Sequence, residues 1–232
     1  DRADVEGACP VHDNATGILI YRNVYAHNVE RNPLLKGGVQ AAVVNNLIYD
    51  PGKRAIHYNL MALEWAGRNY VTGELAAVGN VMRGGPSPDE GLPLLMLGGD
   101  GDLLYWGKDN IAVGKHGKSL PLFGRYGETQ ARLIEAKAPV SWPKGLNVLP
   151  ARDVETHVLA NAGARPWDRD AHDLRVLFFV AEGRGEIIDD ERQVGGYPLV
   201  EPTHAPFVEA DWNLDTMEPK SGIYPGQKGP IQ

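Results

Sequence analysis

The chain has 232 residues and a formal net charge of −7, so it can bury one substantial core but not several. The negative charge argues against nucleic-acid binding, because no pervasive positive field would attract phosphates. Glycine and proline are frequent, at 28 and 17 residues, without the short period of collagen, and this favours turn-rich β structure. A single cysteine excludes an internal disulfide, and no apolar run is long enough to span a membrane.

Four segments in the first half of the chain share one form: an apolar run, an asparagine and a second short apolar run. The segments are residues 17–25, 42–49, 75–82 and 103–113. Their asparagines are Asn23, Asn46, Asn80 and Asn110. The intervals between these asparagines suit the coils of a solenoid with connections of variable length.

This repeat predicts an all-β fold, a parallel β-helix whose asparagines lie near one longitudinal line. An asparagine at the bend between two strands tolerates a left-handed backbone, and its amide can pair with the equivalent asparagine of the next coil. The alternative is four ordinary strands of a sandwich or barrel. Against it, the turns lack the two-residue Asn-Gly or Asp-Gly hairpin signature.

The second part of the chain has a different pattern. Residues 153–163 combine an aspartate, apolar residues on one helical face and a final glycine, which predicts a short helix. Residues 168–180 predict a second short helix. Residues 201–232 hold five prolines, so we expect an extended tail that covers the flank or end of the solenoid. We assign residues 1–150 to the coils and residues 151–232 to C-terminal helices and tail of the same domain.

A charged segment lies between the first two repeats. It reads Arg31-Asn32-Pro33-Leu34-Leu35-Lys36-Gly37-Gly38 and leads into the apolar strand 43–49 with its asparagine pair. Two cations five residues apart on a rigid strand indicate a ledge that could hold an anion. Further basic residues in this stretch are Arg22, Lys53, Arg54 and His57. An acidic chain with this local cluster remains compatible with an anionic substrate.

The charged segment resembles the active-site strand of the pectate lyases of polysaccharide lyase family 1. In that family the pattern is Arg-x-Pro-x-x-Arg, a glycine-rich pair and an Asn-Asn strand, and here Lys36 stands at the second basic position. A second block, residues 162–198, resembles the C-terminal region of bacterial pectate lyase-like proteins, with Tyr197 at the place of a tryptophan. The two blocks occur in the family's order and separation.

The resemblance implies a right-handed parallel β-helix that is secreted and cleaves an acidic uronan, pectate or polygalacturonate, by β-elimination. It places Arg31 at the position of the catalytic base and Lys36 at that of a ligand for the substrate carboxylate. Arg22, His27 and Arg54 are further candidates for substrate binding. A guanidinium binds a carboxylate with two parallel hydrogen bonds, whereas the ammonium of Lys36 acts as a point charge.

The resemblance also implies Ca²⁺ as a cofactor, but its ligands are not identifiable in this sequence. Three acidic groups offer oxygen ligands in general terms: Asp89-Glu90, Asp100 with Asp102, and Asp189-Asp190-Glu191. In the family the principal calcium carboxylates precede the arginine strand by more than one coil. We therefore expect either that an N-terminal segment of a longer precursor supplies them, or that this protein holds the ledge without a metal site.

Two other interpretations stay open. The protein can be a non-catalytic β-helix that binds acidic glycan, or a lyase that acts on another uronan. The pairs His12-Asp13 and His27-Asn28 flank the first repeat and allow, in principle, a catalytic His-Asp pair. We expect these histidines to be hydrogen-bonded turn residues instead, because nothing near them has the form of an activated serine nucleophile. Secretion follows from the resemblance alone, since residues 1–16 lack the features of a signal peptide.

Overall fold

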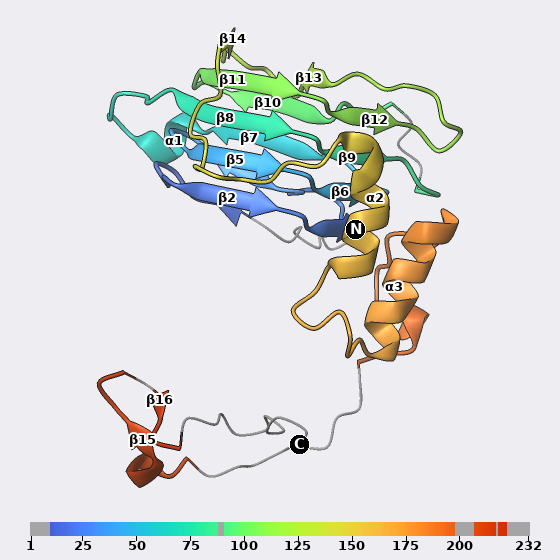
Figure 1. Ribbon diagram of the computed structural model, residues 1–232. Coiled ribbons are helices and arrows are strands. Elements are labelled where there is room, and N and C mark those ends of the chain that lie inside the picture. Colours follow the sequence, from blue (N-terminus) through green and yellow to red (C-terminus); the bar gives the residue numbers. More distant parts are fainter. Residues whose placement is uncertain (1–9, 88–90, 198–206, 217, 222–232) are drawn as a thin grey trace. The chain divides into compact units, whose positions relative to one another are not determined.

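The computed structural model describes residues 10–87, 91–197, 207–216 and 218–221 (Figure 1). The chain forms two compact units, Asp1–Gly196 and Tyr197–Gln232. The strands of the first unit form three sheets, which we name sheets A, B and C. Every pairing between neighbouring strands of these sheets is parallel.

Sheet A consists of β1 (Pro10–Val11), β4 (Leu34–Lys36), β7 (Ile56–Leu60), β10 (Leu95–Gly99) and β13 (Phe123–Arg125). Sheet B consists of β2 (Ile18–Tyr21), β5 (Gln40–Val44), β8 (Gly73–Val78), β11 (Leu103–Lys108) and β14 (Leu133–Glu135). Sheet C consists of β3 (Val24–Ala26), β6 (Leu47–Tyr49), β9 (Val81–Arg83) and β12 (Ile111–Val113).

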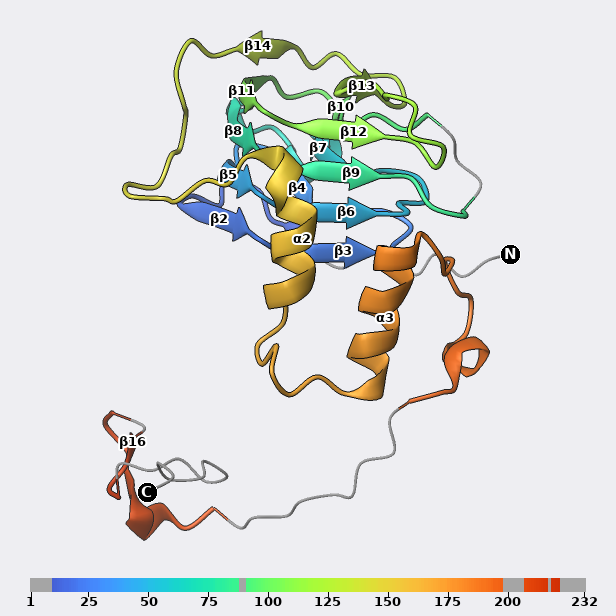
Figure 2. The same cartoon turned by 45° about the vertical axis from the view of Figure 1, so that its right-hand side comes forward.

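The chain passes through sheets A, B and C in the same order each time, and we name each passage a coil. The first coil is β1, β2 and β3, the fourth is β10, β11 and β12, and β13 and β14 follow. Each strand lies beside the equivalent strand of the next coil (Figures 1 and 2). The fold is therefore mostly strands in parallel sheets with a few short helices, and it is compatible with the predicted parallel β-helix. The four repeats form strands of sheets B and C, whereas the strands of sheet A lie outside these repeats.

The predicted asparagine ladder is confirmed. The Asn46 Oδ1 atom accepts hydrogen bonds from the backbone N–H and the Nδ2 atom of Asn23, both at 2.9 Å. In the same way Asn80 Oδ1 accepts from Asn46, and Asn110 Oδ1 accepts from Asn80. The Nδ2 atoms of Asn46, Asn80 and Asn110 also each donate to a backbone carbonyl of the preceding coil, as Asn46 does to Ile20 at 2.9 Å. The ladder thus satisfies polar groups that the stacking of the sheets buries.

The left-handed residue of each bend is not the ladder asparagine, contrary to our expectation. The left-handed residue is the one that directly precedes the ladder asparagine. The four such positions are Arg22, Asn45, Gly79 and Asp109, with φ between 52° and 62°. The ladder asparagine follows and directly precedes the next strand, which begins at Val24, Leu47, Val81 and Ile111 in the four coils. The strain of a left-handed conformation therefore falls on the preceding residue, which glycine, asparagine and aspartate tolerate best.

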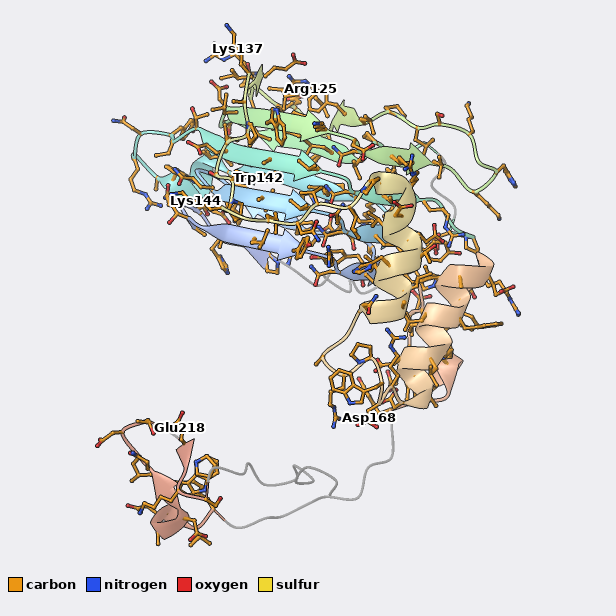
Figure 3. The ribbon with its side chains drawn as sticks, viewed as in Figure 1. Arg125, Lys137, Trp142, Lys144, Asp168 and Glu218 are labelled. Atoms are coloured by element: carbon orange, nitrogen blue, oxygen red, sulfur yellow. The ribbon has the colours of Figure 1, made fainter. Side chains whose placement is uncertain are left out.

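Three apolar clusters hold the first unit together. The main core lies between the sheets and includes Leu35, Ile48, Tyr58 and Leu75. A second cluster joins sheet C to α2 (Ala151–Asn161) through Leu47 and Val154. A third covers sheet B with residues 142–148, where the Trp142 and Trp106 rings lie 5.7 Å apart (Figure 3). Part of the outer face of sheet B is thus buried, and Ala42, Val44, Ala76 and Val78 belong to the cluster on it.

Both predicted helices are present with shifted ends. The first, α2, begins after Pro150 and has no side-chain cap, so Asp153 lies inside it. The second, α3 (Ala171–Glu182), is capped by Asp170, whose carboxylate accepts from the N–H groups of His172 and Asp173. Gly183 ends it in the left-handed conformation. Two shorter helices are α1 (Ala62–Trp65) and η1 (Glu191–Val194).

The substitution Ile48→Val is expected to lower the free energy of unfolding by about 1 kcal/mol, because it removes one buried methylene from the main core. Ile48 has no exposed surface and packs between the sheets. The control is Leu63→Ala in α1, where the side chain is exposed and the change should be within about 0.5 kcal/mol. Equilibrium urea unfolding followed by circular dichroism measures both, and equal effects would contradict the assigned strand orientation.

The second unit contains η2 (Glu209–Asp211) and an antiparallel pair of short strands, β15 (Trp212–Asn213) and β16 (Glu218–Pro219). Much of the predicted tail, residues 201–206, 217 and 222–232, lies outside the described residues. Across the described part of the chain, no helix has both the length and the apolar character needed to cross a membrane.

Candidate functional site

The predicted ledge lies on the outer face of sheet A. Side chains alternate along a strand, and Leu35 of β4 and Tyr58 of β7 point into the main core. Lys36, His57 and Asn59 therefore project from the opposite face, where Lys36 and Asn59 are register partners in β4 and β7. The parallel register brings side chains 23 residues apart in sequence next to one another on this surface.

The segment that carries Arg31 is anchored to the neighbouring coil. Asn32 is buried, donates from Nδ2 to the Arg54 carbonyl at 3.0 Å and accepts from Asn28 at 3.0 Å. The following bond, Asn32–Pro33, is cis. The Pro33 carbonyl accepts from the His57 N–H at 3.0 Å. Arg31 is thus attached to a fixed part of the backbone, as the proposed ledge requires.

The left-handed backbone of Arg31, with φ 63°, does not by itself mark a functional residue. Strained backbone often occurs at active sites. Here the same conformation recurs at Arg22, His27, Asn45 and Asp50, which all lie at bends between sheets. The conformation of Arg31 therefore belongs to the general bend geometry of the coils.

Arg54 is paired and stacked. Its guanidinium forms an ion pair with the Glu30 carboxylate and lies 4.5 Å from the centre of the Tyr126 ring. The Tyr126 ring also lies against Gly98, where an added Cβ atom would be 2.4 Å from the ring. The Arg54 guanidinium and the Gly98 backbone thus both lie against the Tyr126 ring, which restricts its use as an aromatic platform for a sugar.

His57 is the most perturbed group on this face. Its side chain is 3 % exposed, and its ring meets the Tyr126 ring edge to face at 5.8 Å. Burial, together with the positive charges of Arg54 and Arg31, lowers the pKa of His57 to about 3. The imidazole is therefore neutral at pH 7, and its Nδ1 atom has no hydrogen-bond partner within the described residues. Burial raises the pKa of Tyr126 to about 12, so its phenol stays protonated.

Lys36 is less available than the sequence indicated. Its Nζ atom bonds the Glu64 carboxylate of α1, and the Asp13 carboxylate lies 3.9 Å away. Asp13 also accepts a hydrogen bond from the Trp65 indole at 2.6 Å. The Lys36 side chain is 13 % exposed, so two carboxylates neutralise its charge in a partly desolvated place. An anionic substrate would have to compete with them.

Arg22 and His27 lie at the two bends that flank β3 and line two different cavities beside α3. Arg22 donates to the Asn147 carbonyl at 3.3 Å and lines a cleft of about 460 Å³. His27 lines a cavity of about 620 Å³, and its Nδ1 atom lies 2.9 Å from Asp50 Oδ2. The five predicted residues therefore fall into two groups: Arg31, Lys36 and Arg54 on sheet A, and Arg22 and His27 beside β3.

The His27 contact agrees with the expectation of a hydrogen-bonded turn histidine. Asp50 is buried, and burial alone would raise the pKa of its carboxyl group. Hydrogen bonds from His27 and from the Ser87 hydroxyl and N–H outweigh this effect and lower the pKa. Because Asp50 can only accept while it is ionised, the neutral form of His27 carries its proton on Nδ1.

Two of the acidic residues considered for calcium are held in ion pairs. Asp102 pairs with Arg132 at 2.6 Å, and Asp190 pairs with Arg192 at 2.5 Å. Asp89 and Glu90 lie outside the described residues. No cluster of three or more metal-binding side chains occurs among residues 10–87, 91–197, 207–216 and 218–221.

Comparisons of the chain with protein-family models, with curated proteins and with solved structures found no match. The candidate site consequently rests on the residues and their geometry.

The structure adds four residues to the ledge that the sequence did not single out for it: Glu30, Asp13, Glu64 and Tyr126. Glu30 and Asp13 lie in connections between strands and Glu64 lies in the short helix α1, and the positions of all three depend on the stacking of the coils. Tyr126 follows β13, three coils after β4, and only the register β4, β7, β10, β13 brings it to this face. His57 had a weak signal, because it belongs to the basic cluster in the sequence.

Proposed function

We propose that the protein is a right-handed parallel β-helix that cleaves an acidic uronan by β-elimination. The observation that carries the proposal is the Arg31-to-Lys36 segment: it is anchored on a strand of sheet A, with Arg54 and neutral His57 beside it. The right-handed sense is supported by the general preference of crossovers between parallel strands of one sheet. A secreted protein with an acidic polysaccharide as its partner is consistent with the resemblance to pectate lyases.

β-Elimination on a uronan breaks two bonds. A base removes the C5 proton, the C4–O bond breaks as the C4=C5 double bond forms, and the leaving oxygen takes up a proton. Positive side chains lower the barrier because charge develops on the substrate carboxylate as the proton leaves. By resemblance Arg31 takes the C5 proton, while Arg54 and Lys36 face the carboxylate. Arg22 and His27 would contact the substrate only where it extends to the bends beside β3.

We assign no step of the β-elimination to Ca²⁺. The carboxylates nearest the ledge already have partners: Glu30 pairs with Arg54, and Asp13 and Glu64 pair with Lys36. This donor set does not fit a calcium site, which needs six to eight oxygen ligands. The assay therefore includes arms with Ca²⁺ and with a chelator.

The direct test incubates the protein with polygalacturonate and follows the ultraviolet absorbance of the unsaturated product between neutral and alkaline pH. An increase that Arg31→Ala abolishes and Arg132→Ala leaves unchanged supports the proposal. Arg132 is an exposed arginine paired with Asp102 and is a matched control for the loss of a charge. No increase on polygalacturonate or on other uronans, with or without Ca²⁺, would exclude lyase activity.

A second candidate is glycan binding without cleavage. The ion pairs of Arg54 with Glu30 and of Lys36 with Glu64 favour it, because cations that are already paired bind a carboxylate weakly and reversibly. Saturable binding of oligogalacturonate without any unsaturated product would support this candidate over the first.

Variants of the two cations are expected to behave differently. Arg31→Lys should lower kcat by about 100-fold while KM changes little, because the positive charge stays but the planar guanidinium, with its two parallel hydrogen-bond donors, is lost. Lys36→Ala should raise KM and reduce its dependence on salt, since it deletes a screened point charge. Lys36→Arg should preserve or improve activity. Steady-state kinetics at several salt concentrations measures all three, and equally small effects would mean that the segment is only a structural turn.

A further inference from the structure

The larger of the two cavities beside α3 has walls suited to a small ligand. We name it the α3 cavity, and its volume of about 620 Å³ is within the usual range of small-molecule sites. Ala26 and His27, at the end of β3, form one side, and Arg175 and Phe179 of α3 form another. Most of the remaining wall comes from residues 183–194, which follow α3. Figure 2 shows α3 next to the end of β3.

The loop after α3 is tied to the coils at two points. The Tyr49 hydroxyl of β6 donates to the Arg184 carbonyl at 3.0 Å. The Ile187 N–H donates to the Ser87 hydroxyl at 3.4 Å, and this hydroxyl donates in turn to the buried Asp50 carboxylate at 2.7 Å. These contacts hold the wall of the α3 cavity in place without a ligand, which limits the entropic cost of binding.

The imidazole of His27 is a wall of the α3 cavity and not a ligand contact. Its Nδ1 atom lies 2.9 Å from the Asp50 carboxylate. Its Nε2 atom is buried and has no hydrogen-bond partner within the described residues. Gly185, with φ 80°, lies directly against this atom, because an added Cβ atom would be 2.6 Å from it. A ligand in the cavity must therefore find its polar partners on other residues.

Arg175 and Arg184 carry the positive charges of the α3 cavity. Across the part of the chain that the structure describes, neither forms an ion pair with a carboxylate. Each guanidinium lies over an aromatic ring: Arg175 is 5.7 Å from the centre of the Phe179 ring, and Arg184 is 5.9 Å from that of Phe178. Stacking on a ring orients a guanidinium and leaves the N–H donors at its edge available. Both groups can therefore donate to an anion.

Most of the other lining side chains are apolar. Those that are partly buried and line the cavity from α3 and from the loop after it are Val176, Phe179, Ile188 and Val194. Among the described lining residues the two arginines outnumber one carboxylate, that of Glu186. A cavity with mainly apolar walls and a few placed polar groups is the common form of a small-molecule site. The charge balance of the α3 cavity favours an anion.

We propose that the α3 cavity is a binding site for a small organic carboxylate with an apolar body. The guanidinium groups of Arg175 and Arg184 bind the carboxylate through their N–H donors, and the apolar side chains cover the body. A sugar acid fits less well, because its hydroxyl groups would lose water against Val176 and Ile188 without gaining partners. The site is therefore distinct from the uronan ledge on sheet A, and it does not depend on lyase activity.

The test measures the binding of naphthoate to the whole chain by isothermal titration calorimetry. Naphthamide is the matched neutral probe, because it has the same ring system and lacks the charge. Naphthoate should bind saturably, and at least about 10-fold more tightly than naphthamide, since only the carboxylate forms charge-assisted hydrogen bonds with the arginines. Oligogalacturonate should not displace it.

Variants of the two arginines locate the site. Arg175→Gln and Arg184→Gln should each weaken naphthoate binding by about 10-fold. Both variants should bind naphthamide as the original chain does, which shows that the cavity itself is intact. The control is Arg152→Gln, because the Arg152 side chain belongs to α2 and is 82 % exposed, and this variant should bind both probes unchanged.

Four outcomes would overturn the proposal. The first is no saturable binding of naphthoate, and the second is equal affinity for naphthoate and naphthamide. The third is equal naphthoate affinity in the two cavity variants and in the Arg152 control, because the carboxylate would then bind elsewhere. The fourth is displacement of naphthoate by oligogalacturonate, which would assign the cavity to the polysaccharide instead.

Discussion

Asn46→Ala is expected to lower the free energy of unfolding by about 3–5 kcal/mol, more than most core substitutions of similar size. Asn46 has no exposed surface, and its amide bonds both neighbouring coils. Its Oδ1 atom accepts from Asn23, while its Nδ2 atom donates to Asn80 and to the Ile20 carbonyl. The alanine would leave several of these buried groups without partners, and each one carries its own desolvation cost.

Asn23→Ala is the matched control, because it changes the same ladder at its exposed end. There the lost Nδ2 bond is replaced by water, so the free energy of unfolding should fall by no more than about 1 kcal/mol. Urea unfolding of the two variants and the original chain measures the difference. A loss at Asn46 as small as that at Asn23 would show that the ladder contributes little to the stacking of the coils.

The stability of the protein is expected to fall steeply with acid because of His57. Its pKa is about 3 in the folded chain and about 6.5 in an unfolded chain. Between these pH values the imidazole is protonated in the unfolded chain and neutral in the folded chain. The contribution of His57 to the free energy of unfolding is therefore fully present above pH 6.5 and is lost as the pH falls toward 3. From pH 7 to pH 4 this one group should remove on the order of 3 kcal/mol.

His57→Gln removes this titration while it keeps a polar side chain of similar size. The difference in unfolding free energy between pH 7 and pH 4 should therefore be smaller in the variant by about the same 3 kcal/mol. His116→Gln is the control, because His116 is exposed, and it should retain the pH dependence of the original chain. If His57→Gln and the original chain lose stability in parallel, His57 is not held neutral by burial and by its two arginines.

The same environment bears on the candidate site. The positive charges of Arg54 and Arg31 both lower the pKa of the His57 imidazole on sheet A. A bound carboxylate would offset part of their positive field and make protonation of His57 easier. The sheet A group is therefore the part of the predicted site that the geometry supports best, whereas Arg22 and His27 are occupied with the bends and cavities beside β3.

The sequence by itself determined the repeating part of the fold. The apolar-Asn-apolar form identifies the strands of sheets B and C, because an asparagine buried at a bend must find its partners in the next coil. It also identifies both C-terminal helices, whose ends are local and are set by Asp170 and Gly183 in α3. It did not identify the strands of sheet A, which are short and differ in pattern from coil to coil.

Only the tertiary structure decided which charges meet. The sequence places Arg31 and Lys36 in one segment, but it does not show that Glu64 and Asp13 neutralise the charge of Lys36. Nor does it show that the Tyr126 ring contacts both the His57 ring and the Arg54 guanidinium. These contacts join residues that are distant along the chain, and they depend on the parallel register and on the lengths of the connections. Salt screens electrostatic interactions over about 8 Å at physiological ionic strength, so the chemistry of the ledge follows from that three-dimensional placement and not from the order of its residues.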